Sequence, residues 1–210
     1  MKIGERYGEL YDNEWTDAIE FTSDLKQLFT ALTPEEFQKL VIHHLYRILT
    51  QCYQECLKLS HDQLLTIAQV FLFDTSKADT DIESLPGCKE VAAIRRQYAD
   101  KFAKELYQNK ILVENIVCSD WQYPLKSEDL MRRLMNTSFY EKCLQICWSM
   151  AIQNPVMLLS DDIPPGTVYD RNIYKEFVHS GDKVDYVVWP ALFLHKGGPL
   201  LFKGVVQAYK

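Results

Sequence analysis

The sequence TPEEFQKLVIHHLYRILTQCYQECLKL, residues 33–59, carries the clearest helix start in the chain. Thr33 can cap the helix, Pro34 suits its first position, and Glu36 completes a capping box. The apolar side chains that follow recur every three or four residues, which places them on one face of a helix. They are Phe37, Leu40, Val41, Leu45, Ile48, Cys52, Cys56 and Leu59, and His44 lies on the same stripe. A long helix with one buried face is therefore predicted.

The sequence around this helix predicts more helices. An almost wholly apolar helix that begins at a cap formed by Ser60 and Asp62 is expected to be central, and an amphipathic helix is expected on the surface. Residues 74–87 contain Ser, Thr, Asp and Pro and predict an exposed loop. The predicted helices cover residues 13–31, 61–73, 89–110 and 127–153, the last as one bent helix or two.

The end of the chain changes character. Residues 184–194 and 200–209 are rich in β-branched and aromatic side chains, and the turn sequence HKGGP separates them. This pattern predicts two strands in a β-hairpin, with Pro190 confining the first strand to an edge or breaking it. The fold class expected is mainly α, a single helical-bundle-like domain over residues 1–210. Residues 1–160 would be helical, and residues 161–210 would form a loop and the C-terminal β-hairpin.

Composition narrows the function. The 210 residues hold 23 Lys and Arg against 29 Asp and Glu, a net charge of −6, which argues against a nucleic-acid partner. The longest uncharged stretch, residues 143–160, is interrupted by Pro155 and predicts a buried helix with its exit loop, so no transmembrane segment is expected. Six cysteines without a signal peptide predict reduced thiols in a cytoplasmic protein.

Two cysteine pairs are the main candidates for chemistry. Cys52 and Cys56, like Cys143 and Cys147, lie one helical turn apart and could together present four thiolates to zinc, but their apolar stripes favour core packing. An enzyme with a Cys/His site is a remote alternative, which would need Cys143, Cys147, His43 or His44 to converge in an open pocket. No catalytic residue, metal or cofactor is therefore predicted.

Three stretches resemble one known family. They are ELYDNEWTDA at residues 9–18, CWSM at residues 147–150 and VDYVVWPALFLHKGGPLLFKGVVQ at residues 184–207. Together they resemble the C-terminal domain of the mitochondria-eating protein family. The resemblance implies a non-enzymatic interaction domain in mitochondrial quality control, acting through protein partners and self-association at the mitochondrial outer membrane. It further implies a cytoplasmic protein with peripheral membrane association, BH3-only outer-membrane receptors as partners, and the lipid cardiolipin as a ligand.

Candidate binding residues follow from this hypothesis. Cardiolipin carries two phosphates and a large apolar volume, so a peripheral binder needs basic side chains beside exposed apolar groups. The basic candidates are Arg95, Arg96, Lys101, Lys104, Lys196 and Lys203, and the apolar candidates for an interaction surface are Trp189, Phe193 and Phe202. The competing interpretation places the aromatic side chains in the core and the basic ones in solvent.

Overall fold

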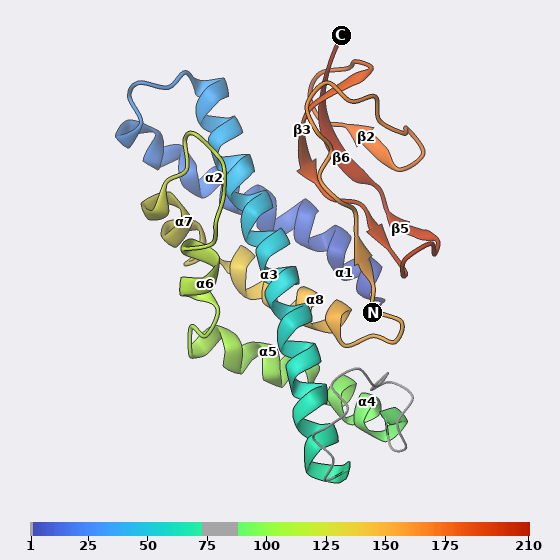
Figure 1. Ribbon diagram of the computed structural model, residues 1–210. Coiled ribbons are helices and arrows are strands. Elements are labelled where there is room, and N and C mark those ends of the chain that lie inside the picture. The colour runs from blue at the N-terminus through green and yellow to red at the C-terminus, as the bar shows by residue number, and fades with distance from the viewer. Residues whose placement is uncertain (1, 73–87) are drawn as a thin grey trace.

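The computed structural model describes residues 2–72 and 88–210. Helices make up its N-terminal part, and two three-stranded sheets form its C-terminal part (Figure 1). The fold is therefore mixed α and β, with more sheet than the predicted hairpin. Within the described residues, no helix is both long and apolar enough to cross a membrane. That residues 1–210 form a single domain stays a prediction, and the loop predicted at residues 74–87 lies outside the described residues.

The chain begins with an unbroken helical run. It consists of α1 (Ile3–Glu9), the π-helix η1 (Leu10–Trp15), α2 (Thr16–Phe21) and the 3-10 helix η2 (Thr22–Leu28). The run begins ten residues before the predicted helix at 13–31. The sequence pattern missed α1 because its seven residues make about two turns, too few to show a repeat. The π-helix that follows has a wider turn, so its buried side chains depart from the 3.6-residue repeat.

Helix α3 (Pro34–Leu72) begins as predicted. The Thr33 hydroxyl accepts a hydrogen bond from the Glu36 amide at 3.2 Å, and the Glu36 carboxylate accepts one from the Thr33 amide at 2.8 Å. The predicted break at Ser60 and Asp62 is wrong, because α3 continues through both residues. The Ser60 hydroxyl instead donates to the Ala151 carbonyl at 3.0 Å. The second half of α3 is not central either, and Val70 is 64% exposed.

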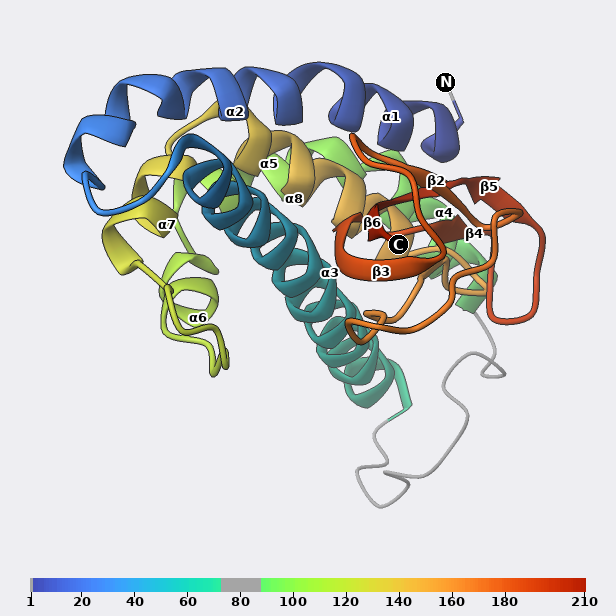
Figure 2. The same ribbon diagram turned by 90° about the horizontal axis from the view of Figure 1, so that it is seen from above.

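Helix α8 (Ser138–Ala151) occupies the centre instead. Ten of its fourteen residues are buried, including Phe139, Tyr140, Leu144, Trp148 and Met150. Figure 2 shows α8 between the N-terminal helical run and α3, and it contacts both. Only Ser138 and Lys142 of α8 are exposed, so other elements must cover most of its surface, and α8 organises the helical part.

The remaining helices are short. They are α4 (Cys88–Gln97), α5 (Ala99–Gln108), α6 (Val113–Val117) and α7 (Glu128–Leu134). The single helix predicted at residues 89–110 is thus divided at Tyr98. Residues 127–153, predicted as one bent helix or two, contain two helices, α7 and α8. The Ser127 hydroxyl caps α7 by accepting from the Leu130 amide at 3.3 Å, as its sequence predicts.

The two sheets replace the predicted hairpin. In one sheet β4 (Leu192–Phe193) lies between β1 (Leu158–Leu159) and β5 (Leu200–Phe202), and both pairings are antiparallel. In the other, β6 (Gly204–Tyr209) pairs in parallel with β2 (Tyr174–Glu176) and antiparallel with β3 (Lys183–Trp189). The two predicted strands do run antiparallel, but each is divided, the first at Pro190, which has no N–H for the ladder.

Trp189 joins the sheets to the N-terminal helices. Its ring lies 5.1 Å from that of Tyr7 and 5.2 Å from that of Tyr11, measured between centroids. The Tyr7 hydroxyl donates to the Pro190 carbonyl at 2.8 Å. Trp189 and Tyr7 are both completely buried. The first turns of the chain and the Trp189–Pro190 segment therefore share one core.

His44 fixes the entrance to α7 from within α3. The Ser127 amide donates to His44 Nε2 at 3.0 Å, so Nε2 carries no proton and Nδ1 donates to the Leu40 carbonyl at 2.7 Å. Burial lowers the pKa of His44 from 6.5 to about 4, although both hydrogen bonds oppose this change. Protonation at Nε2 would remove the bond to Ser127 and charge a buried ring.

Acid should therefore weaken the fold between pH 6.5 and 4. The unfolded chain binds a proton at His44 before the folded chain does, so its contribution to stability is complete above pH 6.5 and is lost as the pH falls toward 4. In this pH range the free energy of unfolding of His44→Gln should fall less steeply as the pH decreases. The slope, measured by urea unfolding at each pH, should be smaller by about 1.4 kcal/mol per pH unit. His179→Gln, at an exposed position, is the matched control. Equal slopes for His44→Gln and the unmodified chain would contradict this role.

Candidate interaction surface

Three adjoining hollows lead from the space among α3, α4 and α5 to Leu194 and Leu201 beside the β4–β5 strand pair. The first, of about 290 Å3, lies among α3, α4 and α5. The second, of about 120 Å3, shares Arg95 with the first and shares Gln153 and Asn154 with the third. The third is the largest, at about 830 Å3. We call the continuous surface formed by these hollows the Arg95 groove.

Apolar side chains line both ends of the Arg95 groove. At the α4 end, Ile94 is 57% exposed and Tyr98 is 52% exposed, and both border the first hollow. At the sheet end, Leu194 and Leu201 are exposed beside α1. Lys2, Glu5 and His195 also line the third hollow. Exposed apolar side chains bordered by polar ones are typical of a surface that binds another molecule.

Arg95 is the buried charge in the middle of this groove. Only 9% of the residue is exposed. Its Nε donates to the Gln63 side-chain oxygen at 2.8 Å, and its Nη2 donates to the Ser60 hydroxyl at 2.7 Å and the Ser60 carbonyl at 3.1 Å. The guanidinium also lies 5.5 Å from the Trp148 ring centroid, within the range of a cation–π interaction.

Neutral groups make all of these contacts with Arg95. In the part of the chain that the structure describes, no carboxylate forms an ion pair with it. Burial lowers the pKa of Arg95, which is the direction expected when a guanidinium is removed from water without a counter-charge. A carboxylate or phosphate that entered the groove would supply that counter-charge.

The other predicted basic residues do not form one cluster with Arg95. Arg96, Lys101 and Lys104 are exposed on α4 and α5. Lys196 and Lys203 are exposed beside β5, and the Lys203 ammonium donates to the Arg171 carbonyl at 2.9 Å. The six predicted residues thus lie on α4, on α5 and in the turns on either side of β5, and only Arg95 lines the groove.

The apolar residues predicted for an interaction surface lie deeper than expected. Trp189 is completely buried, while Phe193 and Phe202 are partly buried against the core. The exposed apolar residues of this region are their neighbours Leu194 and Leu201, which were not among the residues predicted for the surface. Strand alternation between Leu200 and Phe202 could have identified Leu201, since successive side chains point to opposite faces.

The residues suggested for chemistry do not converge in an open pocket. Cys52, Cys56, Cys143 and Cys147 are all buried in the core. Burial raises the pKa of each of these thiols, which makes them poor nucleophiles. His43 instead stacks near Tyr123 and Tyr186, at 4.5 and 5.0 Å between centroids. Among residues 2–72 and 88–210, no group of His, Cys, Asp or Glu is arranged to hold a metal ion.

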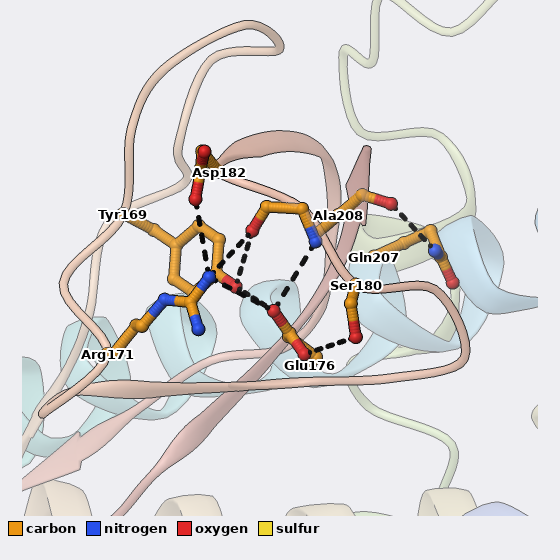
Figure 3. Close-up of polar contacts among 8 residues, drawn as sticks. Tyr169, Arg171, Glu176, Ser180, Asp182, Gln207 and Ala208 are labelled. Carbon is orange, nitrogen blue, oxygen red and sulfur yellow. Dashed lines mark hydrogen bonds and ion pairs between the residues drawn. The ribbon is translucent and has the colours of Figure 1, made fainter. Parts of the chain in front are cut away.

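A second polar cluster surrounds Glu176 at the end of β2 (Figure 3). Its carboxylate accepts hydrogen bonds from the Tyr169 hydroxyl at 2.9 Å and the Ser180 hydroxyl at 2.7 Å. Both hydrogen bonds hold the pKa of Glu176 below its ordinary value, and the bond from Ser180 has the larger effect. Arg171 donates to the Gly181 carbonyl at 3.3 Å and thereby closes the same loop. The cluster satisfies its own polar groups, so its role is to hold this loop against β6.

Gly181 tests this structural role. A Cβ atom at this position would collide with the backbone carbonyl of Tyr209 on β6. Gly181→Ala should therefore lower the free energy of unfolding by about 2–4 kcal/mol, measured by urea denaturation. Ser180→Ala, which removes one solvent-exposed hydrogen bond in the same loop, should cost much less than Gly181→Ala. A smaller loss for Gly181→Ala than for Ser180→Ala would show that the loop is not held against β6.

The whole chain matches one family model. The model is described as mitochondria-eating protein and covers residues 1–208, from α1 into β6. Comparisons with curated proteins and with solved structures found no match. Two of the sequence stretches that resemble the family, residues 9–18 and 184–207, meet in the structure where Tyr11 packs on Trp189. The chain belongs to the mitochondria-eating protein family.

Proposed function

We propose that this chain is a non-enzymatic interaction domain that acts in mitochondrial quality control. It works from the cytoplasm through protein partners and self-association at the mitochondrial outer membrane, where its attachment is peripheral. The observation that carries the proposal is the Arg95 groove, in which a buried guanidinium lies among apolar side chains. The high pKa of the buried thiols supports a role without catalysis.

The groove favours an amphipathic helix as its occupant. Its first hollow lies among three helices and is lined by Ile67, Ile94, Tyr98 and Phe102, which suit the apolar face of a fourth helix. Charge complementarity adds a second requirement. The occupant needs one carboxylate on that face, placed to reach Arg95, because the described part of the chain supplies none.

The family suggests where such a helix is found. BH3-only receptors of the mitochondrial outer membrane are the partners that the sequence resemblance implies. A receptor segment that folds into the groove would bring the domain to the membrane without inserting any part of the domain into lipid. Recruitment through a receptor agrees with the exposed and apolar character of the groove.

Peptide binding tests this function. Overlapping synthetic peptides from the cytosolic region of a BH3-only receptor should include one that binds, measured by fluorescence anisotropy of the labelled peptide. Replacing its acidic residue with the matching amide should weaken binding by roughly tenfold. With Arg95→Met, the acidic and amide peptides should bind equally, since the charge they distinguish is gone. Tyr98→Ser should weaken both peptides through lost apolar contact.

The matched control is Arg96→Met, which removes an exposed neighbouring guanidinium. It should leave the preference for the acidic peptide unchanged. Circular dichroism of every variant checks that the helices are intact. The proposal fails when no receptor peptide binds, or when the acidic preference survives in folded Arg95→Met.

Direct binding of cardiolipin is the second candidate function. Exposed Arg96, Lys101 and Lys104 lie on α4 and α5, near exposed Ile94 on α4 and exposed Tyr98 between the two helices, which combines positive charge with apolar side chains. Under this candidate function, Arg95 and the separate pair Lys196 and Lys203 contribute less, because Arg95 is buried and the pair lies on another element.

Liposome sedimentation tests this candidate. Cardiolipin vesicles should pellet more of the chain than phosphatidylserine vesicles of equal surface charge, and the difference should persist in moderate salt. Lys101→Glu combined with Lys104→Glu should remove the difference, because the helix surface would then repel the lipid phosphates. Lys58→Glu on α3 is the control. Equal pelleting by both lipids, lost in salt, would reduce the effect to general charge attraction.

A further inference from the structure

Arg95, which lines the second hollow of the groove, has hydrogen-bond donors that the protein does not use. A guanidinium carries N–H donors on all three of its nitrogens. The bonds to Gln63 and Ser60 use Nε and Nη2, and within the described residues Nη1 donates no hydrogen bond. The Nη1 donors of a residue that is only 9% exposed therefore have no acceptor from the described protein. Leaving charged donors without an acceptor is unfavourable, and a bound molecule would satisfy them.

These donors can be reached from the groove. Among the described residues, the wholly enclosed side-chain nitrogens without a partner include Arg47 Nε but not Arg95 Nη1. Nη1 thus keeps some accessible surface, although most of the side chain is covered. Arg95 lines the first and second hollows, so an acceptor that reaches Nη1 enters through this groove.

Asn154 brings further donors to the second hollow. It is exposed, and its side-chain amide supplies N–H groups beside those of Arg95 in the lining. Its backbone N–H donates to no carbonyl of the described residues. Within the part of the chain that the structure describes, no carboxylate lines this hollow. An anion that enters it would therefore meet donors and no charge of its own sign.

The remaining wall of the second hollow is aliphatic. It is formed by Leu57, Leu64, Ala92, Ile152 and Val156. The hollow has a volume of about 120 Å3. A dry cavity of roughly 150 Å3 holds benzene, so this hollow has room for a chain of a few carbons. One guanidinium without a counter-charge matches a single negative charge.

We propose that the second hollow binds a small aliphatic carboxylate, whose oxygens accept hydrogen bonds from Arg95 Nη1 and Asn154. Its short carbon chain packs on the aliphatic wall, and a free acid of this kind needs no other part of the groove. Since the proposed function places the acidic residue of a receptor helix on Arg95, the bound acid excludes that residue, and this consequence rests on the proposed function. A small carboxylate thereby regulates how tightly the domain binds its receptor.

Butyrate and butyramide are the probes, because they have nearly the same shape and differ in charge. Binding is measured from the shifts of backbone amide NMR signals around the second hollow, with sodium butyrate replacing sodium chloride at constant ionic strength. Butyrate should shift these signals at millimolar concentration, and butyramide should bind roughly tenfold more weakly. This comparison uses the unmodified chain, so it does not depend on the folding of any variant.

Variants locate the bound acid. Ala92→Leu should weaken butyrate binding by roughly tenfold, because the longer side chain fills the hollow while Arg95 stays in place. Arg95→Met should remove the preference for butyrate over butyramide, and Asn154→Ala should weaken butyrate binding by a smaller factor. Arg96→Met is the matched control, since it removes an exposed guanidinium that does not line the hollow. It should bind butyrate as the unmodified chain does.

A competition experiment separates this site from the proposed function. Butyrate should weaken binding of the acidic receptor peptide and leave binding of the matching amide peptide unchanged. When no receptor peptide binds, the proposed function fails and the butyrate titration still decides whether the site exists. The proposal is overturned when butyrate shifts no signal at the hollow, when butyramide binds as well as butyrate, when folded Arg95→Met keeps the preference for butyrate, or when butyrate leaves the affinity for a bound acidic peptide unchanged.

Discussion

The burial of most of α8 is the constraint on which the other helices depend. Ten of its fourteen residues are buried, so α3, α5 and the N-terminal helical run must all pack against it. The same helix provides Trp148, which is 1% exposed and lies beneath the Arg95 guanidinium. Packing and the candidate interaction surface are therefore linked, because the residue that completes the core also positions the buried charge.

Local signals predicted the elements whose causes are local. The cap at Thr33, the cap at Ser127 and the strand character after Val184 all depend on neighbouring residues, and the structure confirms each one. The continuation of α3 through Ser60 was missed because Ser60 satisfies its hydroxyl on Ala151, which lies 91 residues later in the chain. A helix boundary predicted from one capping residue is wrong when the hydroxyl of that residue donates to a distant carbonyl instead.

The sequence predicted some of the residues that form the candidate site, but it did not predict how deeply each of them is buried. Sequence identified Arg95 as a basic residue on a helix but could not show that Ser60, Gln63 and Trp148 enclose it. It identified the aromatic residues around Trp189 but placed them on a surface, whereas Tyr7 and Tyr11 cover Trp189. Both differences have one cause, since side chains far apart in sequence determine which residues remain exposed. Gly8 illustrates the point, because a Cβ there would press on the Phe202 ring.

The hydrogen bond from Tyr7 to Pro190 joins residues 183 positions apart, and this separation governs how the protein is made. During synthesis the N-terminal helices leave the ribosome long before Pro190 and Trp189 do. Until then Tyr7 and Tyr11 have no partner from the sheets, so their apolar rings stay open to solvent and to chaperones. Contacts between distant parts of a chain also form slowly, because a long loop must close first. This part of the core is thus completed only after Trp189 and Pro190 have left the ribosome, and a chain stalled before them would expose this aromatic surface to quality-control factors of the cell.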